Sequence, residues 1–275
     1  MGRLTLFLCL VFSLFTNCLF AQADSVFHTT IQKNISGDFV NFFVDNLGNT
    51  FLLTATNQVK KYDDKADSVA VFNDVRRYGN IYSMDVTNPL RILFYYRDFA
   101  TALILDRFLN IRNTIDLRKA GITQARAVAQ SYDNNIWVFD ELESKIKKID
   151  ELGKVVFEST DFRLLFDDAV NPVKIIDYNK SLYLYDNKLG WYIFDYYGAF
   201  QKKLPYPNWQ DVQVFDNGLS GVENNAVNSL SLNNFAADVT IVKMGIDLTG
   251  IRKLQYAANK IYVLRNNGLN IYAVQ

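Results

Sequence analysis

Cysteine and histidine are nearly missing from this chain. The two cysteines, Cys9 and Cys18, both lie in an apolar N-terminal segment, and the one histidine is His28. Once that segment is removed, the chain has no thiol for disulfides, nucleophilic catalysis or thiolate metal ligands. A histidine metal site needs two or three histidines, and a Ser-His-Asp arrangement needs a histidine beside a nucleophile. We therefore predict no catalytic residue, no metal and no cofactor.

Charge and carboxylate pairs give no stronger signal. The 29 Lys and Arg balance the 29 Asp and Glu, which disfavours phosphate-backbone binding and predicts no nucleic-acid partner. Asp167-Asp168 could form a glycosidase pair, and Asp63-Asp64 with Asp67 a calcium loop. Adjacent aspartates in one loop are more often a solvated turn, and the regular calcium-ligand spacing is missing. The chain also has no glycine-rich phosphate loop.

Residues 1–21 are typical of a secretory signal peptide. Arg3 supplies the basic start, and Leu4 to Phe15 form an apolar run that is short for a membrane span. Ala21 followed by Gln22 offers a cleavage point, although a retained membrane anchor is an alternative. After signal removal we expect no transmembrane segment.

A lipoprotein is a second alternative because Cys18 sits at a suitable distance from the start. Phe15 and Asn17 fit a lipobox poorly, so we do not expect lipidation. The ending Phe-Ala-Gln resembles signal peptides of Bacteroidota. That resemblance implies an exported protein of the periplasm, of the outer membrane or of the extracellular space.

A turn motif recurs along the rest of the chain at steps of 43, 44, 45 and 38 residues. It consists of a large apolar residue, then Asp or Asn, then a polar or aromatic residue. Its central residues are Asp63, Asp106, Asp150, Asp195 and Asn233. Asp and Asn suit tight turns because their side chains accept hydrogen bonds from nearby backbone N–H groups. A period of this length is typical of propeller blades and other repeat folds.

Each unit contains three or four short strands rich in Val, Ile, Leu, Tyr and Phe. The clearest unit runs through Val173–Asp177, Leu182–Asp186, Trp191–Asp195 and Ala199–Leu204. Such a sheet has two apolar faces, and radial stacking of its neighbours buries both. We predict an all-β protein, a β-propeller with six blades of four antiparallel strands, forming one domain over residues 22–275. Five or seven blades are alternatives because the fifth unit is irregular.

The two chain ends favour a closed ring. The last unit, from Ile251, stops after a third strand at Leu269–Val274, and a lone β-type segment, Ser25–Ile35, precedes the first full unit. We predict that this segment supplies the missing outer strand of the last blade and so holds the ring shut.

Two motifs carry a family resemblance. Asp45–Asn49 with Lys60–Asp63, and Lys148–Val155, resemble bacterial NHL-type and related six-bladed propeller repeats. The resemblance extends from Asp38 to the C-terminus. Members of that group mostly bind proteins or ligands, and a few are lyases or lactonases with metal or histidine centres.

Binding residues are expected on the face shared by the connections between units and by the loop between the second and third strands of each unit. Arg, Tyr and Trp are favoured at interaction hot spots. The candidate ligand- or partner-binding residues are Arg76, Arg77, Tyr78, Arg97, Arg118, Lys119, Arg163, Trp191, Tyr206 and Trp209. Arg77, Arg118 and Arg163 recur at steps of 41 and 45, so a framework position in each unit is an alternative reading.

Two functions are compatible with the sequence. The first is an exported, non-catalytic scaffold that binds a protein partner of the cell envelope. The second is a carbohydrate or small-ligand binding protein, or a weak enzyme, that uses the loop face and central channel, with Trp191, Tyr206 and Trp209 stacking on sugar rings. A glycan is therefore a possible ligand.

Overall fold

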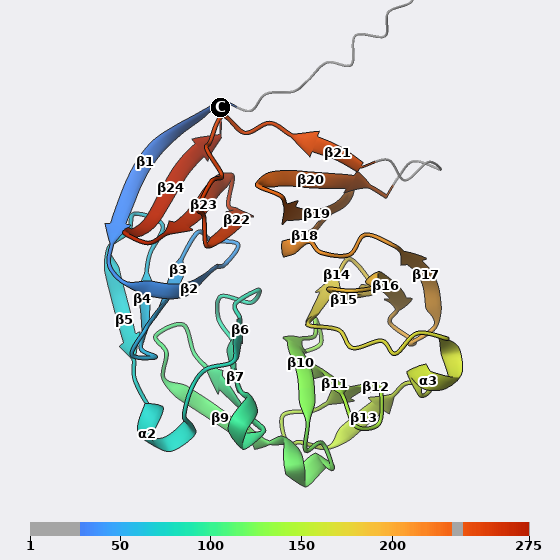
Figure 1. The fold of residues 1–275 in the computed structure, drawn as a ribbon. Coiled ribbons are helices and arrows are strands. Elements are labelled where there is room, and N and C mark those ends of the chain that lie inside the picture. The colour runs from blue at the N-terminus through green and yellow to red at the C-terminus, as the bar shows by residue number, and fades with distance from the viewer. Residues whose placement is uncertain (1–27, 233–238, 275) are drawn as a thin grey trace, which may run out of the picture.

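The computed structural model describes residues 28–232 and 239–274. They form six four-stranded antiparallel sheets arranged as blades around a central axis (Figure 1). The predicted six-bladed β-propeller is therefore confirmed. The predicted signal peptide, the segment Ser25–Phe27 of the expected closing strand, and the turn at Asn233 lie outside the described residues.

Each blade is built outward from an inner strand. Blade 1 contains β2 (Phe39–Val44), β3 (Thr50–Thr54), β4 (Val59–Tyr62) and β5 (Ser68–Phe72). Blade 2 contains β6 (Ser83–Asp85), β7 (Ile92–Tyr96), β8 (Thr101–Leu105) and β9 (Ile111–Asp116). Blade 3 contains β10 (Ala125–Gln130), β11 (Ile136–Asp140), β12 (Lys145–Ile149) and β13 (Val155–Glu158).

The second half of the ring repeats this order. Blade 4 contains β14 (Lys174–Tyr178), β15 (Ser181–Asp186), β16 (Gly190–Asp195) and β17 (Phe200–Leu204). Blade 5 contains β18 (Gln210–Phe215), β19 (Gly218–Glu223), β20 (Ala226–Ser231) and β21 (Val239–Val242). Blade 6 contains β22 (Lys253–Ala257), β23 (Lys260–Arg265), β24 (Gly268–Val274) and β1 (Thr29–Ser36).

Blade 6 closes the ring with both ends of the chain. Strand β1 pairs with β24 antiparallel from Thr29↔Val274 to Ser36↔Gly268, with one irregularity after Ile31. The asymmetry of the chain ends therefore predicted the closure correctly. Figure 1 shows β1 beside β24 at the outer rim of this blade.

Apolar contacts between blades hold the ring together. The middle strands β7, β8 and β11 are buried along their whole length, because both of their faces meet a neighbouring blade. Aromatic rings fill the spaces between blades: Phe162 stacks on Phe194 with ring centroids 5.2 Å apart, and Tyr185 lies 4.8 Å from Trp191. Such pairs contribute on the order of 1 kcal/mol each beyond the burial of their area.

At the axis, side chains of one inner strand satisfy the backbone edge of the next. Gln255 on β22 donates to the Val44 carbonyl and accepts from the Val44 N–H. Gln213 on β18 makes the same reciprocal pair with Tyr256. An unpaired strand edge is a liability in β proteins. These amide clasps satisfy the edge without a fifth strand.

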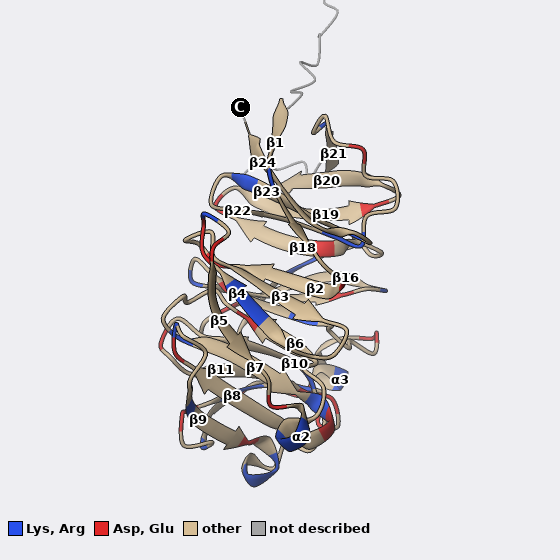
Figure 2. Cartoon of the chain, turned by 90° about the vertical axis from the view of Figure 1, so that its left-hand side faces the viewer, with Lys and Arg blue, Asp and Glu red and all other residues tan. Residues whose placement is uncertain are grey.

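The ring has two faces, which we name by their loops. The connection face contains the links between blades, with α2 (Val75–Tyr78), η2 (Leu117–Ala120) and α3 (Phe162–Leu165), together with η1 (Arg97–Phe99) of blade 2. Figure 2 shows α2 and α3 on the same side of the ring. The turn face is the opposite face and contains the recurring aspartate turns. Among the described residues, no helix is long and apolar enough to cross a membrane.

Candidate functional site

The candidate arginines lie on short helical turns of the connection face. Helices α2, η2 and α3 each follow an aspartate, and the second residue of each is Arg76, Arg118 or Arg163. The equivalent residue in the first connection is thus Arg76, which corrects the alignment based on Arg77. Arg77 comes one residue later and lies over the ring of Tyr78, with its guanidinium carbon 4.9 Å from the ring centroid.

Two of these arginines form ion pairs inside their own turn. Arg118 binds Asp116 with its Nε 2.8 Å from Oδ1, and Arg163 binds Asp161 with its Nη2 2.6 Å from Oδ2. The hydrogen bonds from the arginines lower the pKa of both aspartates. Both arginine side chains are largely exposed to solvent, and exposed ion pairs contribute little to stability. The repeat therefore marks a local turn structure and not a contact between blades.

Arg97 takes part in a framework contact. Its Nη2 lies 3.2 Å from Glu141 Oε2, and its guanidinium lies over the Tyr82 ring. Glu141 also accepts hydrogen bonds from Gln124 and from Asn171, which precedes blade 4. This carboxylate therefore joins blades 2, 3 and 4 on the connection face.

The aromatic candidates are mostly buried. Trp191 is 0 % exposed, Trp209 is 3 % exposed, and Tyr78 is also buried. Tyr206 is half-buried and stacks on Trp209, with ring centroids 5.6 Å apart. Trp191 and Trp209 pack into the core between blades 4 and 5, so neither indole presents a face on which a sugar ring could stack. Of the remaining candidates, Arg76, Arg77 and Lys119 are exposed.

The carboxylates that the sequence raised as alternatives are engaged in ordinary contacts. Asp168 pairs with Lys203 at 2.7 Å, and Asp63 accepts hydrogen bonds from the backbone of its own turn. Within the described ranges, no group of three His, Cys, Asp or Glu side chains is arranged to hold a metal ion.

The turn face repeats one structure in atomic detail. In each of four turns an aspartate Oδ1 accepts from the backbone N–H groups two and four residues later; the aspartates are Asp63, Asp106, Asp150 and Asp195. Asp45 in the first turn of blade 1 does the same. The side chain two residues after the aspartate then points to solvent.

That outward position is occupied by a large apolar residue in four of the five turns. These side chains are Leu47, Phe108, Leu152 and Tyr197, and their exposed fractions run from 53 to 93 %. We call these four residues the apolar tips. A lysine, Lys65, takes the position in the remaining turn. Because the turns all lie on one face, the tips present apolar surface on that face over blades 1 to 4.

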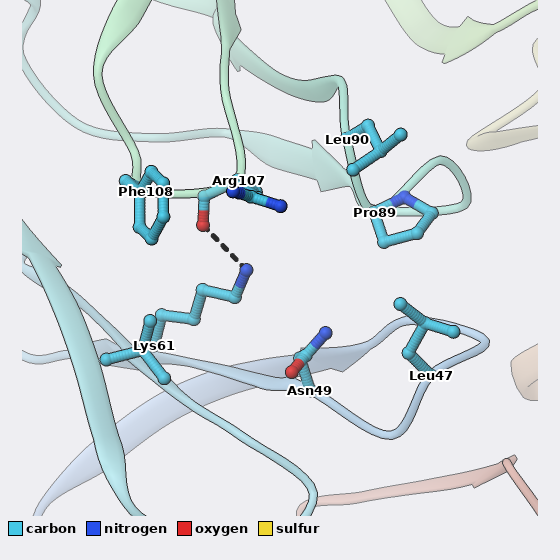
Figure 3. A pocket seen from close by; sticks show the side chains of 8 residues that line it. Leu47, Asn49, Lys61, Pro89, Leu90, Arg107 and Phe108 are labelled. Atoms are coloured by element: carbon cyan, nitrogen blue, oxygen red, sulfur yellow. Dashed lines mark hydrogen bonds between the residues drawn. The ribbon is translucent and has the colours of Figure 1, made fainter.

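A small pocket of about 190 Å³ opens between blades 1 and 2 at two of these tips (Figure 3). Its apolar lining comes from Leu47, Val69, Pro89, Leu90 and Phe108. The buried Lys61 reaches it from β4 and donates to the Arg107 carbonyl at 2.7 Å. Burial lowers the pKa of this lysine. Figure 3 shows the ammonium directed at that carbonyl, with Leu47 and Pro89 across the pocket.

A second group of residues that the sequence analysis missed lies at the axis. Asn41, Lys174, Asp211 and Lys253 stand near the starts of the four adjacent inner strands β2, β14, β18 and β22. We call these four residues the axial cluster. Because all inner strands start on the connection face, the cluster lies at that end of the axis. Charged residues at corresponding strand starts were the signal that could have revealed it.

Electrostatic shifts concentrate in this cluster. Burial, and next the charge of Lys174, lower the pKa of Lys253 to about 7. Burial also lowers the pKa of Lys174 and raises that of Asp211. Groups with shifted pKa values often mark functional sites, although structural networks shift them too.

Comparisons with known proteins support the fold. No family model matches the chain, and no curated relative was found. The Neurospora crassa Pan2 WD40 domain is similar in structure, with a TM-score of 0.66, 11% identity and coverage of 90% of this chain and 96% of that one. Virginiamycin B lyase from Staphylococcus aureus has a TM-score of 0.58 and 16% identity, covering 85% of this chain and 80% of that one. The WD40 propeller domain of Doa1 has a TM-score of 0.55 and 12% identity, with coverage of 89% and 95%.

At these identities the likeness shows a β-propeller fold alone. It does not single out the NHL type over other propellers, so that resemblance stays a prediction. The described residues are built as a six-bladed β-propeller, and this chain is a member of that fold.

Proposed function

We propose that this protein is an exported, non-catalytic β-propeller that acts as a scaffold by binding a protein partner of the cell envelope through its turn face. The observation that carries the proposal is the set of apolar tips. Large apolar side chains, each two residues after the aspartate of a turn in one of four blades, form a surface that water does not favour. A rigid ring holds them at fixed spacing, so the surface is ready for a partner without rearrangement.

The pocket between blades 1 and 2 supports the same surface. Its volume suits one apolar side chain of a partner, and Leu47 and Phe108 line it as well as belonging to the tips. The ammonium of Lys61 at its edge can offer a hydrogen bond to a carbonyl or carboxylate of that partner. A buried anchor surrounded by neutral contacts is the usual energetic pattern of a protein interface.

One comparison and the place of the histidine support a role without catalysis. One of the similar structures is a catalytically inactive His-to-Ala variant of virginiamycin B lyase with quinupristin. The only histidine of the present chain is His28, which stands immediately before the outer strand β1 and is exposed. It is therefore far from the axis, where inner strands gather. Export is supported by the basic start, apolar run and Ala21-Gln22 junction of the leader.

A site-specific photo-crosslinker tests the partner surface in the producing cell. We expect crosslinkers at Phe108 and Leu152 to capture one discrete protein, and a crosslinker at Leu164 on α3 of the connection face to capture none. Leu164 is 80 % exposed, so it is a matched control for accessibility. Equal capture from both faces, or none from the turn face, would overturn the proposal.

A separate experiment tests whether the protein is exported. The intact mass of the mature protein should correspond to a chain that begins at Gln22, and the protein should fractionate with the cell envelope or the medium. A mass that retains residues 1–21, in the cytosolic fraction, contradicts export and leaves the partner surface to be judged separately.

A further inference from the structure

The axial cluster brings two lysines and one aspartate together on adjacent blades. Lys174 interacts electrostatically with both Asp211 and Lys253, so the three groups lie within one electrostatic neighbourhood. Asp85 also acts on Lys174, so the formal charges of these two lysines and two aspartates balance. Arg126 on the next inner strand, β10, adds a positive charge near the same end.

Lys174 and Lys253 are placed differently. The Lys253 ammonium donates to Asn41 Oδ1 and to the Phe42 carbonyl and lies 3.8 Å from the centroid of the Phe43 ring. Two of the three N–H donors of Lys253 are thus engaged in hydrogen bonds, and the Phe43 ring lies against its ammonium. Lys174 donates to the Val212 carbonyl at 3.0 Å, while an ammonium has three donors. Protein surrounds the Lys174 ammonium, while the residue as a whole is exposed to solvent. A solute at the axis can therefore reach it.

Backbone irregularities occur at the two other groups, Asp211 and Arg126. Strand β18 has a register shift between Gln210 and Gln213, and Asp211 inside it adopts a positive φ of 51°. Strand β10 has a shift between Ala125 and Ala127, at Arg126. Bulges of this kind redirect side chains and are frequent beside functional sites. The Arg126 Nε is buried and has no hydrogen-bond partner, which is a costly state for a charged group unless an acceptor arrives.

We propose that the axial cluster, with Arg126, binds a small oxyanion, a carboxylate or phosphate group, at the connection-face end of the axis. Lys174 and the Arg126 guanidinium supply the donors, and Lys253 adds positive charge where it is protonated. Asp211 limits the affinity, because its carboxylate repels the ligand from the same neighbourhood. The site goes beyond the proposed scaffold role, since it lies on the opposite face from the apolar tips.

The competing explanation is structural. Lys174 joins β14 to blade 5 through the Val212 carbonyl, and Lys253 joins β22 to blade 1 through the Phe42 carbonyl. Lysines that serve only as clamps would lower the stability of the ring when removed. They would not give the protein any specific response to an anion. The two explanations therefore differ in ligand dependence and not in stability alone.

The test titrates the full mature protein with inorganic phosphate, acetate or glucuronate, with sodium chloride at equal ionic strength as the reference. We expect at least one oxyanion to raise the Tm in a saturable way, because a ligand of the folded state stabilises it. Phosphate acting alone assigns the phosphate source, and glucuronate or acetate the carboxylate source. Isothermal titration calorimetry gives the affinity of the active probe.

Matched variants separate binding from clamping. Lys174→Met should weaken the binding of the active probe at least tenfold, whereas Lys202→Met, on the exposed outer strand of the same blade, should not change it. Asp211→Asn keeps an acceptor for the Leu254 N–H and should tighten binding several-fold, so it remains informative if Lys174→Met does not fold. Probes that act no differently from sodium chloride, or variants that leave the affinity unchanged, overturn the proposal.

Discussion

The turn face and the connection face treat the same repeat in opposite ways. On the turn face each aspartate binds the backbone of its own turn and leaves an apolar side chain outside. On the connection face, charged side chains pair within or between loops, and charged groups with shifted pKa values collect at the axis. The comparison teaches that repetition preserves backbone geometry, while the positions that vary between blades set the chemistry of each face.

The largest difference in stability should come from replacing an aspartate by alanine on each face, Asp140 on the connection face and Asp150 on the turn face. Asp140 on the connection face is 1 % exposed and binds the buried ammonium of Lys147 at 2.8 Å. Burial alone would lower the pKa of Lys147, but its bonds to Asp140 and Glu143 raise it. Asp140→Ala should therefore cost about 3–5 kcal/mol in the free energy of unfolding, measured by urea denaturation.

A double variant checks the cause of that loss. In Asp140→Ala with Lys147→Met the buried charge is gone, so part of the stability should return. If the single variant loses less than the turn-face variant described below, the ion pair does not have the importance assigned to it.

Lys253, at the connection-face end of the axis, should make the free energy of unfolding depend on pH. The Lys253 amine keeps its proton up to its usual pKa of 10.5 in the unfolded chain but only up to about 7 in the folded protein. Unfolding therefore takes up a proton between these values, and stability rises with pH there, by at most about 1.4 kcal/mol per pH unit. Two charged groups next to it, Lys174 and Asp211, also have shifted pKa values.

Urea denaturation at pH 7 and pH 9 measures this slope. Lys253→Met has no proton to gain, so its curve should be flatter than that of the unmodified protein. Equal slopes for the two proteins would show that the amine titrates near its ordinary value in both states.

The turn face should respond less to the loss of an aspartate. Asp150→Ala removes acceptors for the N–H groups of Leu152 and Lys154, but water can replace them in this exposed turn. We expect a loss of about 1 kcal/mol, comparable to the loss of a helix cap. Thermal unfolding measures it, and a loss as large as that of Asp140→Ala would remove the contrast between the faces.

The smallest effect should come from the repeated arginine. Arg118→Ala breaks only an exposed ion pair within η2, so the Tm should remain unchanged within error. Leu164→Asp is a useful companion, because it changes an exposed side chain of another connection. A clear drop in the Tm of Arg118→Ala would show that this arginine is a framework residue that stabilises the fold.

Sequence alone captured what is local and what the chain ends impose. The Asp turns were recognisable because their hydrogen bonds span four residues, and the role of β1 followed from a last blade that lacked a strand. The axial cluster was missed, because Lys174 and Lys253 stand 79 positions apart and come near each other only when blades 4, 5 and 6 pack around the axis.

A one-residue boundary explains the error about Trp191. The sequence pattern placed the start of the strand at Trp191, but this residue was also counted with the loop before it. The chain turns at Gly190, where an added Cβ would lie 2.3 Å from the Leu204 carbonyl oxygen. Trp191 is therefore already the second residue of β16 and points into the core. The sequence pattern did not show that this side chain faces the core between blades 4 and 5.

The shared blade at the chain ends has a consequence for how the protein is made. Asn34 donates a hydrogen bond to Asn270, 236 residues later, so blade 6 cannot be completed until β24 has been synthesised. Until that moment β1 has no partner strand, and its free edge is open to pairing with a second molecule. A premature stop codon just before β24 would therefore leave the ring without the β1–β24 pairing and expose it to proteolysis or aggregation.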